Sequence, residues 1–166
     1  MRLGLLGGSF NPIHRCHLSI ARSARQLLQL DRVLFIPTGD PPHKQPGTLA
    51  AASHRHRMVQ LAIQDTPEFA LTDIEIQRSG KSYSIDTVRA IQQEYGPDTV
   101  LFFIIGLDAF LDLPSWKEAD TLLKSCHFVV ISRPSTSFQA MAAIPLFRDV
   151  PQTTLTALDE VRQERA

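Results

Sequence analysis

The sequence predicts an α/β fold in which a single Rossmann-like, doubly wound and mainly parallel sheet carries helices on both faces. Two features support this class. Short apolar runs alternate with helical patterns along the chain, which is the order of strand–helix–strand units. Several runs end in glycine or a charged residue, and ligands bind at that end of the strands in an open α/β sheet. The length of 166 residues fits one domain, covering residues 1–166.

The composition excludes several classes of protein. Lys and Arg together number 17, as do Asp and Glu, so no overall field favours nucleic acid or an anionic membrane. The two cysteines, Cys16 and Cys126, form no C-x-x-C motif, which argues for a reducing compartment. The N-terminus does not resemble a signal peptide, and no apolar run reaches membrane-spanning length. We therefore expect a cytoplasmic protein without nucleic-acid or membrane partners.

The first predicted unit is a strand, a helix and a second strand. The apolar run Leu3–Leu6 indicates a buried strand that breaks at Gly7-Gly8. A helix opens at His14 and is expected to end near residues 30–31. The run Arg32–Ile36, closed by a proline, indicates the second strand. This spacing predicts a right-handed βαβ unit.

The link between this strand and helix favours an anion site. Gly7 and Gly8 let backbone N–H groups approach a phosphate closely, because no Cβ stands in the way. Ser9–Pro12 carry the chain through a turn, and the helix dipole favours negative charge at the helix start. His14 and His17 lie three residues apart there, so both can point at one anion. Each charge-assisted hydrogen bond from them is worth roughly 1.5–3 kcal/mol.

Further elements complete the predicted sheet. They are a helix over 53–65, a strand over 69–76 near an edge, a helix over 85–95, strands over 99–105 and 126–132, and a short terminal helix. The run over 99–105 is the most apolar and is expected to be the central strand. In the helix over 53–65 we expect Met58, Leu61 and Ala62 to face inward and the basic residues 54–57 to be solvated.

Two polar segments fall where ligands are expected. The loop 38–47 follows the second strand and contains Lys44, which on residue type alone is a solvated lysine. Ser84 is a natural N-cap of the helix over 85–95, and Asp86 suits its first turn. A well-made helix start explains both residues, and it also suits an anionic carboxylate.

The two later strands end in comparable positions. Gly106 and Asp108 follow the strand over 99–105, where glycine lets a ligand approach and the carboxylate can accept from a ribose hydroxyl or orient a metal-bound water. Arg133 follows the last strand and can bind an anion there. Trp116 is the single tryptophan, and base rates alone make it a core aromatic.

These strings resemble a known family. Gly7-Gly8-Ser9-Phe10-Asn11-Pro12-Ile13-His14-x-x-His17-Leu18 is similar to the signature of the bacterial H-x-G-H nucleotidyltransferases, and most of the chain resembles nicotinate-nucleotide adenylyltransferase. Matching strings are Pro-Pro-His-Lys at 41–44, Ser-Tyr-Ser-Ile-Asp-Thr at 82–87, Ile-Gly-x-Asp at 105–108 and Val-Val-x-x-Arg-Pro at 129–134. Two positions depart from the signature: Asn11 stands where Asp is common, and Cys16 where Gly is usual.

The resemblance implies adenylyl transfer from ATP to nicotinate mononucleotide, giving nicotinic acid adenine dinucleotide (deamido-NAD) and pyrophosphate in NAD biosynthesis. It implies catalytic roles for His14, His17 and Lys44. It implies ATP binding by Gly7, Gly8, Ser9, Phe10, His14, His17, Gly106 and Asp108. It implies nicotinate-nucleotide binding by Lys44, Tyr83, Ser84, Asp86, Thr87, Trp116 and Arg133, with Trp116 stacked on the pyridine ring. Mg²⁺ is expected to arrive with the ATP phosphates and keep its waters, without a metal site made by the protein.

The resemblance ends after residue 134. Family members continue with a Ser-Ser/Thr-x-x-Arg segment that grips the ATP phosphates, and residues 134–166 contain no such string. We expect either a C-terminally short chain or a phosphate grip supplied by a partner or by altered geometry. Other activities stay open, namely another nucleotidyltransferase of this fold, such as pantetheine-phosphate adenylyltransferase, or a nucleotide-binding protein with lost activity. A homo-oligomer and the choice between nicotinate and nicotinamide nucleotide stay open as well.

Overall fold

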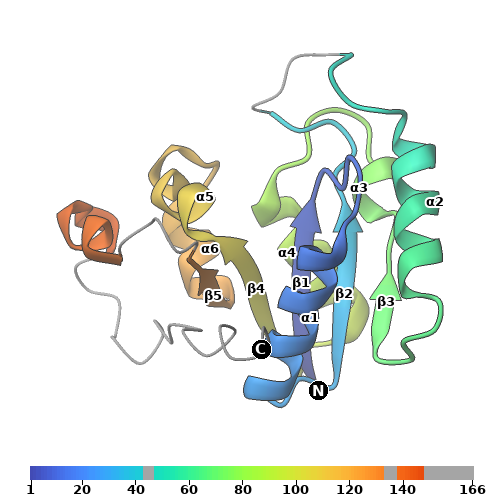
Figure 1. The fold of residues 1–166 in the computed structure, drawn as a ribbon. Helices are drawn as coiled ribbons and strands as arrows, with labels where there is room; N and C mark the ends of the chain where they lie inside the picture. Colours follow the sequence, from blue (N-terminus) through green and yellow to red (C-terminus); the bar gives the residue numbers. More distant parts are fainter. Residues whose placement is uncertain (43–46, 133–137, 148–166) are drawn as a thin grey trace.

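All strands of the described structure lie in one parallel sheet. The computed structural model describes residues 1–42, 47–132 and 138–147, and within them the strand order is β3-β2-β1-β4-β5 (Figure 1). The strands are β1 (Arg2–Gly8), β2 (Arg32–Pro37), β3 (Phe69–Leu71), β4 (Val100–Gly106) and β5 (His127–Ile131). β1 pairs with β2 on one side and with β4 on the other, so the strand order reverses at β1. A ligand crevice is expected at such a switch point.

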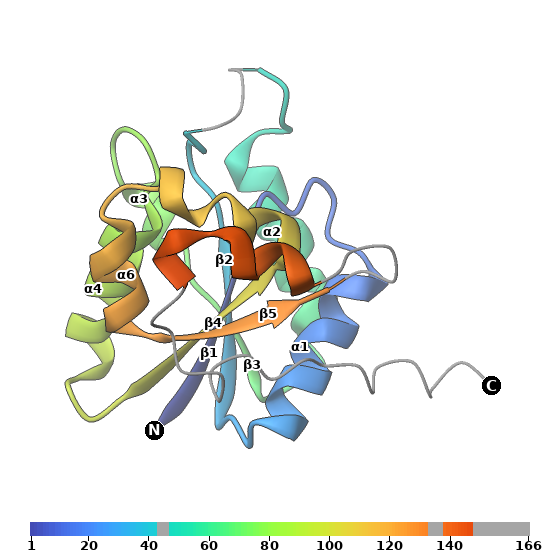
Figure 2. The same ribbon diagram turned by 90° about the vertical axis from the view of Figure 1, so that its left-hand side faces the viewer.

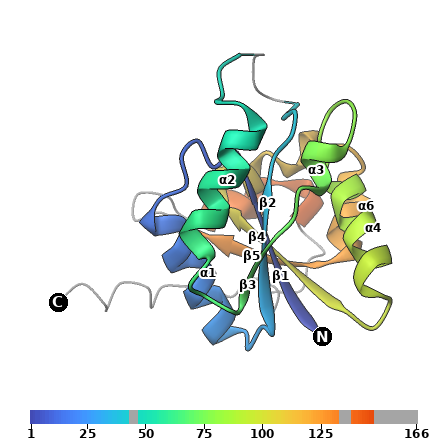
Figure 3. The same ribbon diagram turned by 90° about the vertical axis from the view of Figure 1, so that its right-hand side faces the viewer.

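Helices cover both faces of this sheet. They are α1 (Arg15–Leu27), α2 (Ala52–Ile63), α3 (Ile74–Gln77), α4 (Ser84–Tyr95), α5 (Leu107–Leu111) and α6 (Ala119–Ser125), with 3₁₀ turns η1 (Leu113–Ser115), η2 (Phe138–Ala143) and η3 (Pro145–Phe147). Figure 3 shows α1 and α2 on one face and α3, α4 and α6 on the other. The predicted doubly wound α/β fold is confirmed. No helix in the described ranges is long and apolar enough to cross a membrane.

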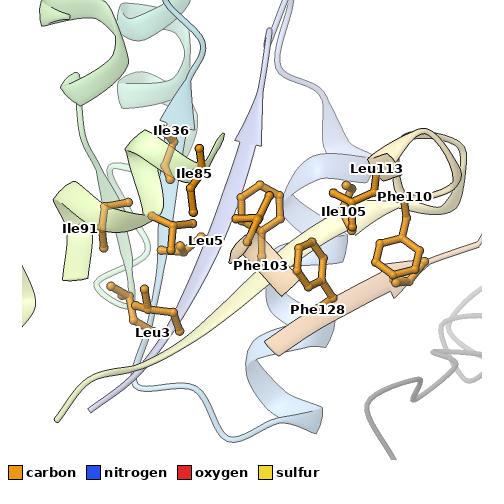
Figure 4. Packing of buried hydrophobic residues seen from close by; sticks show 14 of the residues in the cluster. Leu3, Leu5, Ile36, Ile85, Ile91, Phe103, Ile105, Phe110, Leu113 and Phe128 are labelled. Carbon is orange, nitrogen blue, oxygen red and sulfur yellow. The ribbon is translucent and has the colours of Figure 1, made fainter. Parts of the chain in front are cut away.

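Alternate strand residues enter two cores on opposite faces of the sheet. Leu5 of β1 belongs to the core that includes α4, α5 and α6, whereas Leu6 belongs to the core that includes α1 and α2. Figure 4 shows part of the first core, with strand side chains against Ile85 and Ile91 of α4. In this core, Phe110 of α5 stacks on a ring of η3, which lies beside it (Figure 2). Each fully buried large apolar side chain contributes roughly 1.5–3 kcal/mol, so the strand ends are firmly held.

Two boundaries of the first unit differ from the sequence expectation. β1 does not break at Gly7-Gly8, because both glycines continue the ladder opposite Ile36 and Pro37 of β2. α1 ends at Leu27 instead of near residues 30–31. Gln29 takes a left-handed φ of +49°, and a right-handed α-helix cannot continue through that conformation.

The sheet also differs in its middle and at one edge. The central strand is β1, and the more apolar β4 lies next to it. The stretch 69–76 is not one strand, because β3 ends at Leu71 and the Thr72 hydroxyl accepts a hydrogen bond from the N–H of Ile74 at 3.3 Å. This turn starts α3, so Ile74 lies on a helix. β3 is an edge strand, as expected.

α2 turns a different stripe toward the sheet than the one expected, although Ala62 packs against the core as expected. Its buried residues are Arg55, Val59 and Ile63, each one turn from the next, whereas Leu61 is 49% exposed. The expectation chose apolar residue types, but the i, i+4, i+8 stripe contains an arginine. Arg55, expected to be solvated, is buried with 1% of its surface exposed.

Candidate nucleotide-binding site

A cavity of about 420 Å³ opens at the carboxyl ends of the strands. Its walls come from the end of β1, the loop after β2, the start of α4, the end of β4 and the segment after α5. The predicted site residues that line it are Gly7, Gly8, His17, Tyr83, Ser84, Thr87, Gly106 and Trp116. The fold therefore brings together residues that the sequence keeps far apart, at the switch point of the sheet.

A more open hollow of about 560 Å³ adjoins this cavity, and His17 lines both. Ser9, Phe10 and His14 also line the hollow. Phe10 has a left-handed φ of +44°, and its buried ring lies edge-on to His17 with centroids 5.1 Å apart. The turn after β1 thus runs from one space into the other.

The two histidines form a stacked pair at the start of α1. Their ring centroids lie 3.8 Å apart, and the backbone N–H of His14 donates to Nδ1 of His17 at 3.2 Å. Burial, together with the charge of His14, lowers the pKa of His17 to about 4. At neutral pH His17 is uncharged and carries its proton on Nε2, since Nδ1 accepts a hydrogen bond. His17 therefore offers a neutral hydrogen-bond donor in place of the charge-assisted one that the sequence led us to expect.

Glycines keep two strand ends open to the cavity. A Cβ built on Gly7 or on Gly106 would meet no protein atom within 4 Å. Both residues line the cavity, and both are exposed. Their backbones are therefore accessible to a ligand, and an added methyl group would occupy open space at the site rather than disturb the core.

Aromatic side chains form the opposite wall. The indole of Trp116 is partly buried and lies edge-on to Phe103, with centroids 6.4 Å apart. The N-cap residue of α4 is Tyr83 and not Ser84, as was expected, because the helix begins one residue earlier, at Ser84. The positive end of that helix dipole faces the cavity. Nζ of Lys117 lies 4.9 Å from the centroid of the Tyr83 ring. This wall suits a flat ring that carries negative charge.

Several predicted site residues lie outside the lining. Asp86 accepts a hydrogen bond from Nζ of Lys117 at 2.9 Å and so holds that cavity lysine, which the sequence reasoning missed. Asp108 is exposed in the first turn of α5. Lys44 and Arg133 lie outside the described residues, and their roles stay predictions.

A buried carboxylate was also missed. Glu75 of α3 lines the cavity with 8% of its surface exposed, and its Oε1 accepts from Oγ1 of Thr87 at 2.9 Å. Arg78 donates to the same hydroxyl at 3.0 Å, so Thr87 is engaged on both sides. Burial raises the pKa of Glu75, while the hydrogen bond from Thr87 and the charge of Arg78 act in the opposite direction. The sequence carried one sign of this residue, because it is an acid between two isoleucines. The strand pattern predicted for that stretch, however, places the acid on the outward face.

The donor set does not form a protein metal site in the described part of the chain. No group of three His, Cys, Asp or Glu residues within it is placed to hold a metal ion. Cys16 is exposed and does not complete such a group with the two histidines. A metal ion at this site would need ligands from a bound nucleotide.

The parallel sheet, its switch point and the turn that leads from the glycine end of β1 into α1 define a Rossmann-like, nucleotide-binding class of protein. The chain belongs to the cytidylyltransferase-like family, whose model matches residues 5–160. The resemblance found in the sequence is thereby confirmed, and the match continues beyond residue 134, where the resemblance was expected to end.

Curated relatives carry more specific names. A "probable nicotinate-nucleotide adenylyltransferase" of Citrifermentans bemidjiense is 49% identical over 148 residues, covering 88% of this chain and 68% of the relative. A protein of the same name from Moorella thermoacetica is 45% identical over 133 residues, covering 80% of this chain and 61% of the relative. The chain thus spans about two thirds of the length of these relatives.

A solved structure shares the fold. Plasmodium falciparum nicotinic acid mononucleotide adenylyltransferase complexed with NaAD superposes with a TM-score of 0.73 at 22% identity, covering 87% of this chain and 71% of that one. This likeness supports the Rossmann-like nucleotidyltransferase fold.

Proposed function

We propose that this chain transfers the adenylyl group of ATP to nicotinate mononucleotide, giving nicotinic acid adenine dinucleotide and pyrophosphate. The observation that carries the proposal is the joining of two kinds of wall in one cavity, glycines and His17 on one side and Trp116 with the start of α4 on the other. The names of the relatives, at 45–49% identity over most of the chain, point to the same reaction in NAD biosynthesis.

The reaction needs no protein nucleophile. A phosphate oxygen of the mononucleotide attacks the α-phosphorus of ATP, an O–P bond forms, and the bond from that phosphorus to the bridging oxygen of the β-phosphate breaks. Pyrophosphate leaves with that oxygen. The work left to the protein is to orient the two substrates and to stabilise the charge that shifts toward pyrophosphate.

Each wall has a role in this scheme. His17 donates from Nε2 to a phosphate oxygen of ATP, and His14 beside it contacts the same phosphates. The backbone of Gly7, Gly8, Ser9 and Phe10 forms the cradle. Nicotinate mononucleotide lies with its pyridine ring on Trp116 and its carboxylate at the start of α4, near Tyr83 and Ser84. Gly106 lets the nucleotides approach the end of β4.

Further residues support the two nucleotides. Asp108 accepts from a ribose hydroxyl or orients a metal-bound water, and Asp86 acts through Lys117. We propose that Thr87 acts through Tyr83, because its hydroxyl is engaged within the protein. Lys44 and Arg133 contact phosphate. Mg²⁺ held by the ATP phosphates neutralises part of their charge when it is bound.

Pyrophosphate release tests the proposal. ATP and Mg²⁺ are offered with nicotinate or nicotinamide mononucleotide in parallel, and His17→Ala is measured beside the native chain. We expect release with the acid, weaker release with the amide, and loss of release in the variant. Saturable quenching of Trp116 fluorescence by the mononucleotide without release would instead show a nucleotide-binding protein, and turnover of phosphopantetheine would show a different acceptor.

A further inference from the structure

Two charged residues near the cavity, Arg55 and Glu75, are buried in the protein. They lie on opposite faces of the sheet, on α2 and α3. Burying a charge costs several kcal/mol unless hydrogen bonds compensate it, and an apolar side chain of similar volume is often as stabilising. Burial alone therefore does not explain the two charged residues, and the groups that they bind indicate their role.

Arg55 binds backbone carbonyls of three separate segments. Its Nη1 donates to the carbonyl of Ser9 at 2.8 Å, and its Nη2 donates to that of Thr38 at 2.7 Å and that of Gly39 at 3.4 Å. Its Nε donates to the carbonyl of Ala50 at 2.9 Å. No carboxylate within the described ranges forms an ion pair with it. The guanidinium thus joins the turn after β1 to the segment after β2.

Glu75 approaches the same segment from the other face. A Cβ built on Gly39 would lie 2.1 Å from the backbone oxygen of Glu75, so these two backbones are in direct contact. The N–H of Gly39 and the hydroxyl of Ser82 both interact with the Glu75 carboxyl. Thr87 ties that carboxyl to α4.

The segment held between them, Thr38–Asp40, is itself a wall of the site. The N–H of Thr38 donates to the carbonyl of Gly8 at 2.9 Å. The N–H of Asp40 donates to Oγ of Ser82 at 3.3 Å, and the N–H of Ser82 donates to the carbonyl of Asp40 at 2.9 Å. Thr38 lines the cavity, as does Ser82. The segment therefore connects the phosphate side to the pyridine side by hydrogen bonds at each of its residues.

We propose that Arg55 and Glu75 are paired positioning residues, which hold Thr38–Asp40 between them and so set the position of the two substrate-binding walls relative to each other. This role rests on the proposed adenylyl transfer. In-line attack requires the reacting atoms to lie about 3–3.5 Å apart, and a displacement of about 1 Å can cost roughly 10²-fold in rate. Loss of either residue thus impairs transfer more than it impairs binding of either substrate.

The first test compares Arg55→Met with Arg57→Met, because Arg57 is exposed on the same helix and bonds only Gln60 in the described contacts. We expect kcat to fall by about 10–100-fold in Arg55→Met. KM for each substrate, and Trp116 quenching by the mononucleotide, change by less than about threefold. The Arg57→Met chain behaves as the native chain. A kcat for Arg55→Met equal to that of the control overturns the proposal.

The second test pairs Glu75→Gln with Asp73→Asn, a matched carboxylate exposed at the start of α3. Glu75→Gln is expected to lower kcat in the same manner. Because both residues act on one segment, Arg55→Met combined with Glu75→Gln lowers kcat by clearly less than the product of the single effects. Fully multiplicative effects would show that the two residues do not share that task.

Amide hydrogen exchange separates this proposal from the proposed function, because it needs no substrate. Exchange at the amides of Thr38, Gly39 and Asp40 is expected to accelerate at least tenfold in Arg55→Met and Glu75→Gln, and to stay unchanged in both controls. Native exchange rates at these three amides in the two variants overturn the proposed positioning role, even if the native chain proves inactive. If the native chain shows no turnover, adenylyl transfer is refuted. Accelerated exchange in the two variants would still support the positioning role.

Folding is checked by thermal unfolding. If Arg55→Met is unfolded at the assay temperature, Arg55→Lys replaces it, since the single nitrogen of an ammonium group cannot reproduce four hydrogen bonds made from three separate guanidinium nitrogens. We expect a folded Arg55→Lys chain with an intermediate loss of kcat and native KM values. A native kcat in that variant contradicts a need for the guanidinium geometry.

Discussion

The two walls of the cavity are built by different means. The wall proposed to bind phosphate combines backbone features, namely glycines at the end of β1 and a left-handed Phe10, with the stacked rings of two histidines at the start of α1. The pyridine side depends on side chains, with Trp116 and Tyr83 supported by an ion pair between Lys117 and Asp86. The difference shows that one cavity can join accessible glycine backbone to an aromatic side-chain surface. Variants of each wall should therefore fail in different ways.

The largest expected effect is on the phosphate side. His17→Ala removes the neutral Nε2 donor that we propose for the ATP phosphates, and loss of one such donor costs roughly 10²–10³-fold in kcat. Trp116 quenching by the mononucleotide stays at its native strength, because the pyridine wall is intact. His54→Ala, an exposed histidine on α2, serves as the control. An equal loss in both variants would contradict a specific role for His17.

Glycine substitutions sharpen the comparison between open and packed backbone. Gly106→Ala adds a methyl group that meets no protein atom, so we expect a native melting temperature and KM values raised about tenfold, or about 1.4 kcal/mol. Gly39→Ala places its methyl group against the Glu75 backbone, so we expect it to lower the free energy of unfolding by about 1–3 kcal/mol. Thermal unfolding and steady-state kinetics on both variants give the test, and the reverse pattern would contradict the assignment of the cavity.

Substitution in the aromatic wall proposed for the pyridine ring is expected to weaken binding of nicotinate mononucleotide alone. Trp116→Ala removes an aromatic face, and aromatic pairing contributes roughly 0.5–1.5 kcal/mol beyond the buried area. KM for nicotinate mononucleotide should rise by about 2–10-fold, while KM for ATP stays native. Initial rates at varied concentrations of each substrate measure this. A rise in KM for ATP alone would place the indole on the other nucleotide.

The smallest expected effect is a pH dependence of stability from His17. Its pKa is lowered to about 4 from the ordinary 6.5, so between these values the unfolded chain binds a proton that the folded chain does not. The free energy of unfolding therefore falls as the pH is lowered through this window. The loss is smaller in His17→Gln. Urea unfolding of both chains at pH 7 and pH 5 compares them, and equal losses would show that His17 does not titrate as described.

The sequence predicted the fold because its signals were local and repeated. Apolar runs and the pattern of the helix that follows Tyr83 each depend on a few neighbouring residues, and the confirmed elements carry such patterns. One exception was the stretch 69–76, where Ile74 and Ile76 alternate like a strand but the Thr72 hydroxyl starts a helical turn. There a single side-chain hydrogen bond decided what periodicity could not.

The cavity was predicted only in part. The glycines, His17 and Trp116 were found because residue type and motif marked them. Arg55 and Glu75 were not, because the partners that make their burial possible are backbone groups contributed by distant segments. Only the i, i+4, i+8 spacing of Arg55 with Val59 and Ile63 carried a local sign of its burial.

The most direct test of the account is a crystal structure of the chain with nicotinic acid adenine dinucleotide bound. We expect the pyridine ring on Trp116 with its carboxylate at the start of α4. The diphosphate should lie against the end of β1 and the turn after it, about 2.7–3.2 Å from Nε2 of His17. A dinucleotide with its diphosphate away from that turn, or with its pyridine ring among the histidines, would contradict the assignment of the two walls.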